Sequence, residues 1–248
     1  MRRLALLLGL LLATFAGHLP AAAGEPVFDA REEQAIRDIV ADYLRQNPEI
    51  ILEAVRILRE RQARAESAEV RRTIRQLRDR LERDPNSPVG GNPDGDVTIV
   101  EFFDYRCPYC KRVAPTVREL LERDGNIRMV YKEWPILGPD SEFAARAALA
   151  ARKQGRYLEL HERLMGSKRV DEESVMAAAR ELGLDLERLR ADMRAPETEA
   201  HLAATMELAN RLGITGTPAF VVGEELIPGM ASRATLEKLV ARAREGAS

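Results

Sequence analysis

The sequence predicts an α/β fold that carries a large helical insertion and follows a long helical segment. Runs rich in β-branched and aromatic residues, such as 97–103 and 127–132, are typical of buried strands. Residues 29–84 and 140–212 carry helical patterns over lengths that far exceed an ordinary strand. The order of these segments indicates one α/β domain that is interrupted by helices and preceded by a helical arm.

The first 23 residues have the order of a secretory signal peptide. Arg2 and Arg3 precede an apolar run from Leu4 to Phe15, and small residues follow at 21–23. The alternative is a membrane anchor, but about 12 apolar residues fall short of the roughly 20 that span a bilayer. We therefore expect cleavage after residue 23, export to the periplasm and a mature chain from residue 24 onward.

Charge and cysteine content limit the possible partners. The formal net charge is −2, which gives no electrostatic case for nucleic acid. The chain has two cysteines, at positions 107 and 110, and a disulfide between them would close a loop too small to add much stability. Structural disulfides are common in exported proteins, yet this lone pair indicates catalysis instead.

Residues 24–88 are expected to form a helical segment with one break. Asn47 and Pro48 suit the junction between a short helix and a longer one. Along the longer helix, apolar residues at spacings of four and three form a narrow stripe: Ile51, Val55, Leu58, Val70, Ile74, Leu77 and Leu81. Such a stripe on a charged helix favours self-association. The alternatives are packing on the chain's own domain, or a solvated linker after Arg61.

A second domain is expected over residues 89–248. Prolines, glycines and polar residues at 84–93 mark its boundary. A helix follows the first strand over about residues 108–123, and the helical insertion covers about residues 139–212. Residues 219–229 have the pattern of a tight hairpin.

Cys107 and Cys110 are the candidate redox centre. A thiol attacks a disulfide only as its thiolate. A cysteine at a helix N-terminus faces unpaired N–H groups and the positive end of the helix dipole, which favour that form. Because the pair lies between a strand and a helix, we expect Cys107 to be the nucleophile and Cys110 to resolve the mixed disulfide.

A zinc site is the alternative for two cysteines at this spacing. Structural zinc takes four ligands, and the mature chain offers besides the pair only His161 and His201, both distant in sequence. We therefore expect no metal, and no cofactor, because the electrons reside in the cysteines.

Two motifs resemble those of the thioredoxin superfamily. They are Phe102–Cys110, with the sequence FFDYRCPYC, and Gly216–Phe220, with the sequence GTPAF. The long helical insertion between them resembles the DsbA-like branch. The segment 43–50, YLRQNPEI, further resembles ScsC-like proteins, which are named for suppression of copper sensitivity. The resemblance implies a thioredoxin fold and a protein thiol-disulfide oxidoreductase.

The resemblance also implies roles for individual residues. Pro218 matches a proline that is cis and lies beside the sulfurs, and Thr217 matches the residue whose backbone binds a substrate peptide. Glu101 matches a buried acid beneath the resolving cysteine, and Lys132 matches its basic partner. A desolvated carboxyl has a raised pKa and takes a proton from Cys110. The alternative is that Glu101 and Lys132 face water at strand ends.

Pro108 and Tyr109 are expected to contact substrate and to adjust the redox potential. They resemble the glutaredoxin dipeptide and lack the histidine of the strongly oxidising DsbA type, so a less oxidising potential is expected. The expected function is disulfide exchange with cysteine-containing exported proteins, as an isomerase or moderate oxidase. A membrane redox partner and a homo-oligomer are expected with it. The rival hypothesis is a copper(I)-binding or holdase protein that uses the thiols as ligands.

Overall fold

The computed structural model describes residues 27–246, and the expected signal peptide lies outside this range. The chain divides into two compact units, with the boundary between Arg59 and Glu60. The long helix α2 (Glu49–Glu82) crosses this boundary.

The first unit contains α1 (Ala30–Gln46) and the start of α2. Asp29 caps α1, because its carboxylate accepts hydrogen bonds of 2.8 Å from the backbone N–H groups of Arg31 and Glu32. The Glu32 carboxylate in turn accepts from the Asp29 N–H at 2.9 Å, which completes a capping box. The helix ends at Gln46 with Asn47 as its C-cap, and the predicted break between the two helices is present. No side chain of residues 27–59 is buried.

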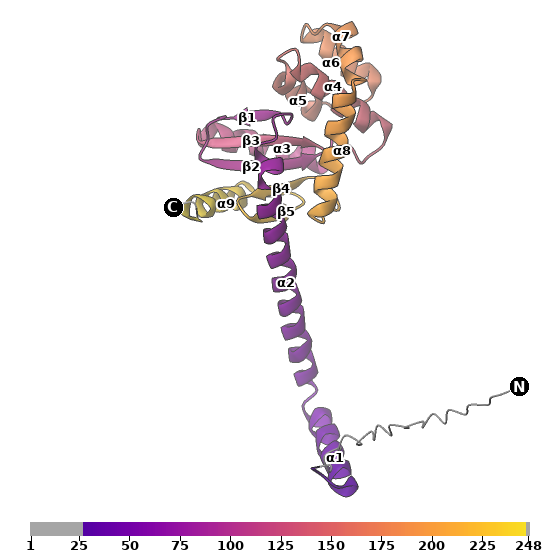
Figure 1. Cartoon of the computed structure of the whole chain (residues 1–248), viewed down its shortest axis with the longest axis vertical. Coiled ribbons are helices and arrows are strands. Elements are labelled where there is room, and N and C mark those ends of the chain that lie inside the picture. The colour runs from indigo at the N-terminus through magenta and orange to yellow at the C-terminus, as the bar shows by residue number, and fades with distance from the viewer. Residues whose placement is uncertain (1–26, 247–248) are drawn as a thin grey trace, which may run out of the picture. The chain divides into compact units, whose positions relative to one another are not determined.

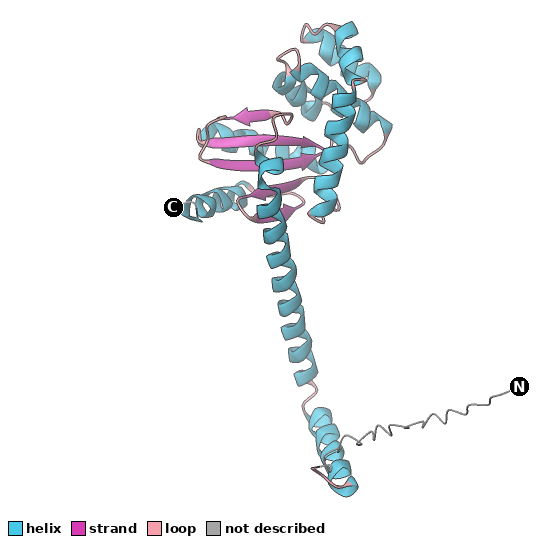
Figure 2. Ribbon diagram, in the orientation of Figure 1, coloured by secondary structure: helices cyan, strands magenta, loops and turns pink. Residues whose placement is uncertain are grey.

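The second unit is built around a five-stranded sheet with the order β1–β3–β2–β4–β5 (Figures 1 and 2). β2 and β3 are parallel, and the other neighbouring strands are antiparallel. β2 and β3 are covered on both faces, so six of the seven residues of each strand are buried, with Glu101, Lys132 and Glu133 among them. The strands are β1 (Val89–Gly91), β2 (Val97–Phe103), β3 (Ile127–Glu133), β4 (Ala219–Val222) and β5 (Glu225–Pro228).

Helices cover both faces of this sheet. One face packs on α3 (Pro108–Arg123) and α9 (Arg233–Gly246). The other face packs on the end of α2 and on α8 (Pro196–Arg211). Alternate residues of β2 enter the two cores, so that Ile99 packs beneath α3 whereas Phe102 packs against α2.

The end of α2 therefore packs on its own domain. Ile74, Leu77 and Leu81 are buried together with Phe102 and Val130. The expectation that the whole apolar stripe serves self-association is wrong for these three residues, because the sheet already covers them. The first part of the stripe remains exposed, at Ile51, Val55 and Leu58.

The insertion between β3 and β4 is helical, as predicted. Its helices are α4 (Pro139–Arg152), α5 (Tyr157–Gly166), α6 (Glu172–Glu181), α7 (Leu186–Met193) and α8. α4 is the central helix of this group and packs on each of the others. Its many buried alanines leave room for the neighbours to approach on several sides.

The edge strand β1 lies where the sequence predicts a domain boundary. Three residues with two glycines carry no strand signal of their own, and antiparallel pairing with β3 creates the strand. A Cβ atom at Gly90 would come within 2.9 Å of the Tyr131 ring, so this close packing requires glycine. The predicted hairpin is present as β4 and β5, with Gly223 at a positive φ of 59° in its turn.

Candidate active site

Cys107 lies at the N-cap of α3, just after the turn that follows β2. Its sulfur accepts a hydrogen bond from the Cys110 N–H at 3.5 Å, and its thiol donates to the Thr217 carbonyl at 3.2 Å. Pro108 occupies the first turn of the helix, where its missing N–H costs no hydrogen bond. The helix N-terminus therefore stabilises negative charge on the Cys107 sulfur.

Cys110 lies one turn inside the helix and is fully buried. Burial raises the pKa of its thiol far above the ordinary value, and the negative charge of Glu101 acts in the same direction. Both cysteines are free in this structure. The pair is chemically unequal, because one sulfur meets the helix N-terminus and the other stays protonated in the core.

Thr217 and Pro218 directly precede β4, and the Thr217 carbonyl contacts Cys107. The contact between Thr217 and Cys107 joins segments that are 110 residues apart in sequence. Antiparallel pairing of β4 with β2 places the two segments together, with Ala219 opposite Phe102. The Thr217–Pro218 peptide bond is cis. Tyr109, between the two cysteines, is 53% exposed and available to a substrate.

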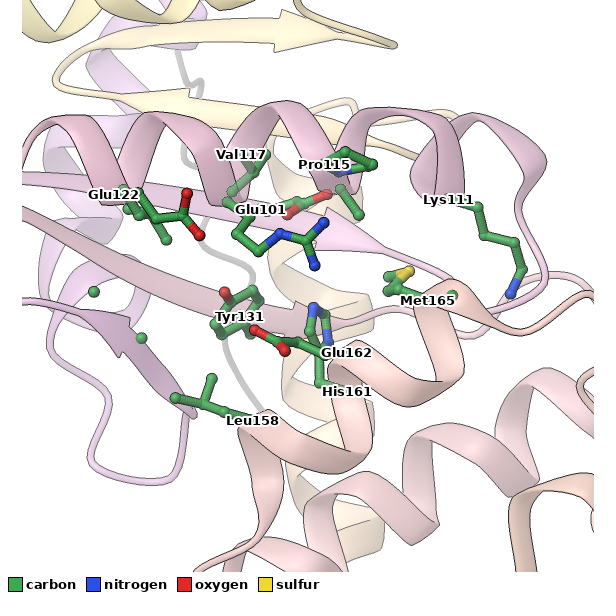
Figure 3. Close-up of a pocket in the computed structure, with 16 residues that line it drawn as sticks. Glu101, Lys111, Pro115, Val117, Glu122, Tyr131, Leu158, His161, Glu162 and Met165 are labelled. Atoms are coloured by element: carbon green, nitrogen blue, oxygen red, sulfur yellow. The ribbon is translucent and has the colours of Figure 1, made fainter. Parts of the chain in front are cut away.

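Glu101 lies on β2 and lines a cavity of about 350 Å³. Figure 3 shows its carboxyl beneath α3, which carries Lys111 and Pro115, and across the cavity from His161 on α5. The side chain is 3% exposed. Burial raises the pKa of Glu101 from 4.5 to about 8. A carboxyl with this pKa changes its protonation near neutral pH, and its negative charge raises the pKa of Cys110.

Lys132 lies on the other face of the sheet. In the parallel register, Glu101 is paired with Tyr131, whereas Lys132 is paired with Phe102. Adjacent residues of a strand point to opposite faces, so the predicted pairing of Glu101 with Lys132 is wrong. The alternative, in which both side chains face water, is also wrong because both are buried.

The Lys132 ammonium instead holds the end of α2 against the sheet. It donates to the Arg80 carbonyl at 2.8 Å, the Ser87 hydroxyl at 2.7 Å and the Asp84 carboxylate at 3.3 Å. Burial lowers the pKa of Lys132, and Asp84 opposes this effect. Lys132 therefore has a structural role, on the face of the sheet opposite the one that carries Glu101.

The turn between β2 and α3, residues 104–107, is called the catalytic turn below. A buried aromatic cluster lies beside it, and the sequence assigned no role to the members of this cluster. The Tyr105 hydroxyl is 3.1 Å from Nδ1 of His161. Phe103, Tyr131 and Tyr157 pack edge-on, tilted or stacked around the imidazole. Burial lowers the pKa of His161 to about 3, so its ring is neutral at physiological pH. No local pattern signals this contact, because α5 reaches the turn through tertiary packing.

Asp104 is the other residue that sequence reasoning left without a role. It follows β2 directly and is 2% exposed, and its carboxylate accepts hydrogen bonds from the Arg106 N–H and from residues 136, 137 and 141, which follow β3. Within residues 27–246, no three His, Cys, Asp or Glu side chains are grouped so that they could hold a metal ion. In the same range, no helix has the length and apolar character needed to cross a membrane.

This fold and this helix-capping Cys-x-x-Cys pair define a thioredoxin-like protein with a dithiol redox centre. The chain belongs to the DSBA-like thioredoxin domain family, which matches residues 98–241. Residues 32–65 match the N-terminal domain of the copper resistance protein ScsC. The predicted fold class and the resemblance to DsbA-like and ScsC-like proteins are thus confirmed, and the family is one of thiol-disulfide oxidoreductases.

Two solved structures illustrate the likeness. A thioredoxin-like oxidoreductase from Silicibacter pomeroyi is 56% identical, with a TM-score of 0.67 over 68% of this chain and 98% of that one. A linker-deletion mutant of Proteus mirabilis ScsC is 30% identical, with a TM-score of 0.68 over 91% of this chain and 100% of that one.

Curated relatives include longer proteins. The Na(+)/H(+) antiporter NhaA 3 of Salinispora tropica is 34% identical over 137 residues, which cover 54% of this chain and 21% of the antiporter. The match therefore spans about a fifth of the length of that relative.

Glu101→Gln is expected to change how stability depends on pH. The pKa of Glu101 is 4.5 in an ordinary environment and about 8 in the folded chain. Below the lower value the carboxyl is neutral in both states, and the stability linked to its proton is fully present. As pH rises toward the higher value, the unfolded chain releases this proton and the folded chain keeps it. The wild-type free energy of unfolding then falls by about 1.4 kcal/mol per pH unit relative to the glutamine variant.

Urea unfolding of both chains at the two ends of this pH range measures the difference. We expect the advantage of the glutamine variant to widen as pH rises. Parallel stability curves would contradict a neutral Glu101 in the folded chain.

Proposed function

We propose that this protein exchanges disulfides with exported, cysteine-containing proteins through a mixed disulfide on Cys107. The observation that carries the proposal is the position of the Cys107 sulfur, which meets both the N-terminus of α3 and the Thr217 carbonyl. A sulfur in this place lies at the N–H groups that begin α3 and next to a backbone on which a substrate strand can bind.

The reaction proceeds in two exchange steps. The Cys107 thiolate attacks a substrate disulfide, so that a Cys107–substrate disulfide forms and one substrate thiolate leaves. The ionised fraction of Glu101 then takes the proton of Cys110, and the Cys110 thiolate attacks the Cys107 sulfur. This step forms the Cys107–Cys110 disulfide and releases the second substrate thiol. The reverse sequence oxidises a substrate, and attack by another substrate thiol on the mixed disulfide isomerises it.

We propose that the protein acts as a disulfide isomerase or as a moderate oxidase. Pro108 and Tyr109 place no histidine between the cysteines, so positive charge inside the motif does not add to the oxidising tendency. The test is turnover of a scrambled disulfide protein in a glutathione buffer. Recovery of native substrate supports isomerisation, and formation of disulfides in a reduced substrate without reshuffling supports oxidase work. A membrane redox partner would keep the pair in the required state.

The periplasm is the proposed location. The signal-peptide pattern of residues 1–23 supports it. A similar protein from Salmonella enterica serovar Typhimurium, 30% identical to this chain, is a periplasmic thioredoxin-like protein and adds to this support.

Self-association through the first unit is proposed as part of this function. Large apolar side chains that are more than half exposed occur along both of its helices: Ile39, Val40, Tyr43, Ile51, Leu52 and Leu58. The match of residues 32–65 to the ScsC N-terminal domain covers this region. A second copy of the same helices would bury these side chains, and it would present several active sites to one misfolded substrate.

Replacing Ile39 and Leu52 by aspartate is therefore expected to convert an oligomer into a monomer. Each charge would be buried without a partner in a helix-to-helix seam. Light scattering of the full chain measures the mass, and Gln62→Asp, an exposed polar position on α2, serves as the matched control. If light scattering gives the mass of a monomer for the wild-type chain, the proposed self-association is wrong.

Copper(I) binding is the second candidate. Its support is the match to a domain named for copper resistance, together with two thiols that are soft ligands. It predicts tight binding of copper(I) with no turnover of scrambled substrate. Turnover that disappears with Cys107→Ala would exclude copper binding as the main function.

A further inference from the structure

Trp134 follows β3 directly and is the one tryptophan of the chain. The residue is 4% exposed, and its indole N–H donates to the sulfur of Met206 on α8 at 3.1 Å. A thioether sulfur is a weak acceptor, whereas the N–H of a buried tryptophan usually has a stronger partner. The buried donor is therefore only partly satisfied by the sulfur that it meets.

Met206 is buried at this contact but open to solvent elsewhere. The residue is 40% exposed. The other methionines in residues 27–246 are buried, at positions 129, 165, 176 and 193, except Met230, which is 43% exposed. A dissolved oxidant reaches an exposed thioether far more readily than a buried one. Met206 and Met230 are therefore the methionines of this range that an oxidant reaches, and they differ in that the Met206 sulfur accepts the Trp134 N–H.

The backbone on either side of this contact is held by packing. Leu208, on the next turn of α8, is 2% exposed and belongs to the same apolar cluster as Trp134. The backbone N–H of Trp134 donates to the Phe103 carbonyl at 2.9 Å. The unbranched methionine side chain is flexible, so it is the part of this contact that can move when the sulfur changes chemically.

We propose that Met206 is a second redox-active group of this chain, which peroxides oxidise to a sulfoxide that the Trp134 N–H then binds. One oxygen atom of the peroxide is transferred to the sulfur, which gives up an electron pair, and the O–O bond breaks. Hydrogen peroxide is thereby reduced to water. The sulfoxide oxygen is a stronger acceptor than the thioether, so the buried N–H gains the partner that it lacks. Neither cysteine takes part, and the reaction is independent of the proposed disulfide exchange.

The contact with Trp134 also determines which side of the sulfur reacts. A hydrogen bond from an N–H group to an oxygen is about 2.9 Å long, whereas the Met206 sulfur itself lies 3.1 Å from the indole nitrogen. No oxygen atom fits between them, so the peroxide attacks the lone pair that faces away from the ring. One sulfoxide epimer is therefore formed in excess. The side chain then rotates to bring its oxygen to the N–H, which changes the surroundings of the indole.

Peptide mapping by mass spectrometry after treatment with hydrogen peroxide tests the site. We expect sulfoxide at Met206 and Met230 and unchanged thioethers at the buried positions. Two methionine sulfoxide reductases, each specific for one epimer, are then applied to the digested peptides. One of them should restore nearly all of Met206 and the other almost none, whereas both should restore a share of Met230. In Trp134→Phe, which lacks the N–H, both should act on Met206.

Tryptophan fluorescence follows the same event in the intact chain, because Trp134 is its one tryptophan. The cysteines are first converted to their disulfide with diamide, so that peroxide does not oxidise the thiols. We expect the emission of the wild-type chain and of Met230→Leu to change as Met206 is oxidised. The emission of Met206→Leu should stay constant under the same treatment. Leucine and methionine have similar volumes, so both variants should fold.

Three results would overturn the proposal. The first is a Met206 that remains a thioether while Met230 is oxidised. The second is equal recovery of Met206 by the two reductases, because the indole would then not direct the attack. The third is an emission change in Met206→Leu as large as that of the wild-type chain, because the indole would then respond to oxidation elsewhere.

Discussion

Cys107→Ala is expected to reduce exchange with protein disulfides to the uncatalysed rate, whereas Cys110→Ser is expected to stop the reaction at a mixed disulfide. The first substitution removes the sulfur that caps α3. The second leaves that sulfur in place and removes the thiol that releases the substrate. Each variant loses one sulfur, but Cys107→Ala should form no mixed disulfide, whereas Cys110→Ser should accumulate one.

Mass spectrometry after incubation with a disulfide-bonded protein measures the outcome. The chain has two cysteines, so any adduct on Cys110→Ser is attached to Cys107. Lys168→Ala is the matched control, since it alters an exposed residue outside the Cys-x-x-Cys motif and keeps both thiols. A stable adduct on Cys107→Ala, or undiminished turnover by it, would contradict the assignment of Cys107 as the nucleophile.

Lys132→Met is expected to lower the free energy of unfolding by about 3 kcal/mol. The lysine side chain is fully buried, and its removal leaves the partly buried Asp84 carboxylate and the Arg80 carbonyl without this donor. The redox equilibrium of the cysteines should change far less, because Lys132 lies on the face of the sheet opposite Glu101.

Urea unfolding and a glutathione equilibrium, measured on the same samples, separate the two effects. Lys168→Met is the control for loss of an exposed lysine and should leave the unfolding midpoint unchanged. Adding Asp84→Asn to Lys132→Met should recover part of the stability, because the unpaired carboxylate is then removed. A large redox change without loss of stability would instead support a pairing of Lys132 with Glu101.

The wrong prediction that Lys132 pairs with Glu101 shows that a sequence pattern can predict strands without predicting which of their side chains share a face. The composition of residues 97–103 and 127–132 predicts both central strands, and the structure has them as β2 and β3. The relative register of two parallel strands is set by the packed core, and a shift of one residue turns every side chain to the other face. The register pairs Glu101 with Tyr131, so Lys132, which is one residue further along β3, points to the opposite face of the sheet.

Local signals served better than long-range ones elsewhere in the chain. Asn47 and Pro48 mark the break between α1 and α2, and the pattern of residues 219–229 marks the hairpin. The contacts of Asp104 with residues 136–141 depend on two loops meeting at one sheet edge. The stripe on α2 is uniform in sequence, but the sheet buries its end and leaves its start exposed. No spacing rule distinguishes these two halves.

The most direct test is the equilibrium of the Cys107–Cys110 pair in a glutathione redox buffer, followed by the fraction of free thiol. We expect the pair to cycle between dithiol and disulfide, with a potential below the roughly −120 mV of a strong oxidase; a value near −200 mV or below would favour isomerase or reductase work. A pair that stays in one state across the whole range of buffers would contradict the proposed disulfide exchange and would favour the copper(I) alternative.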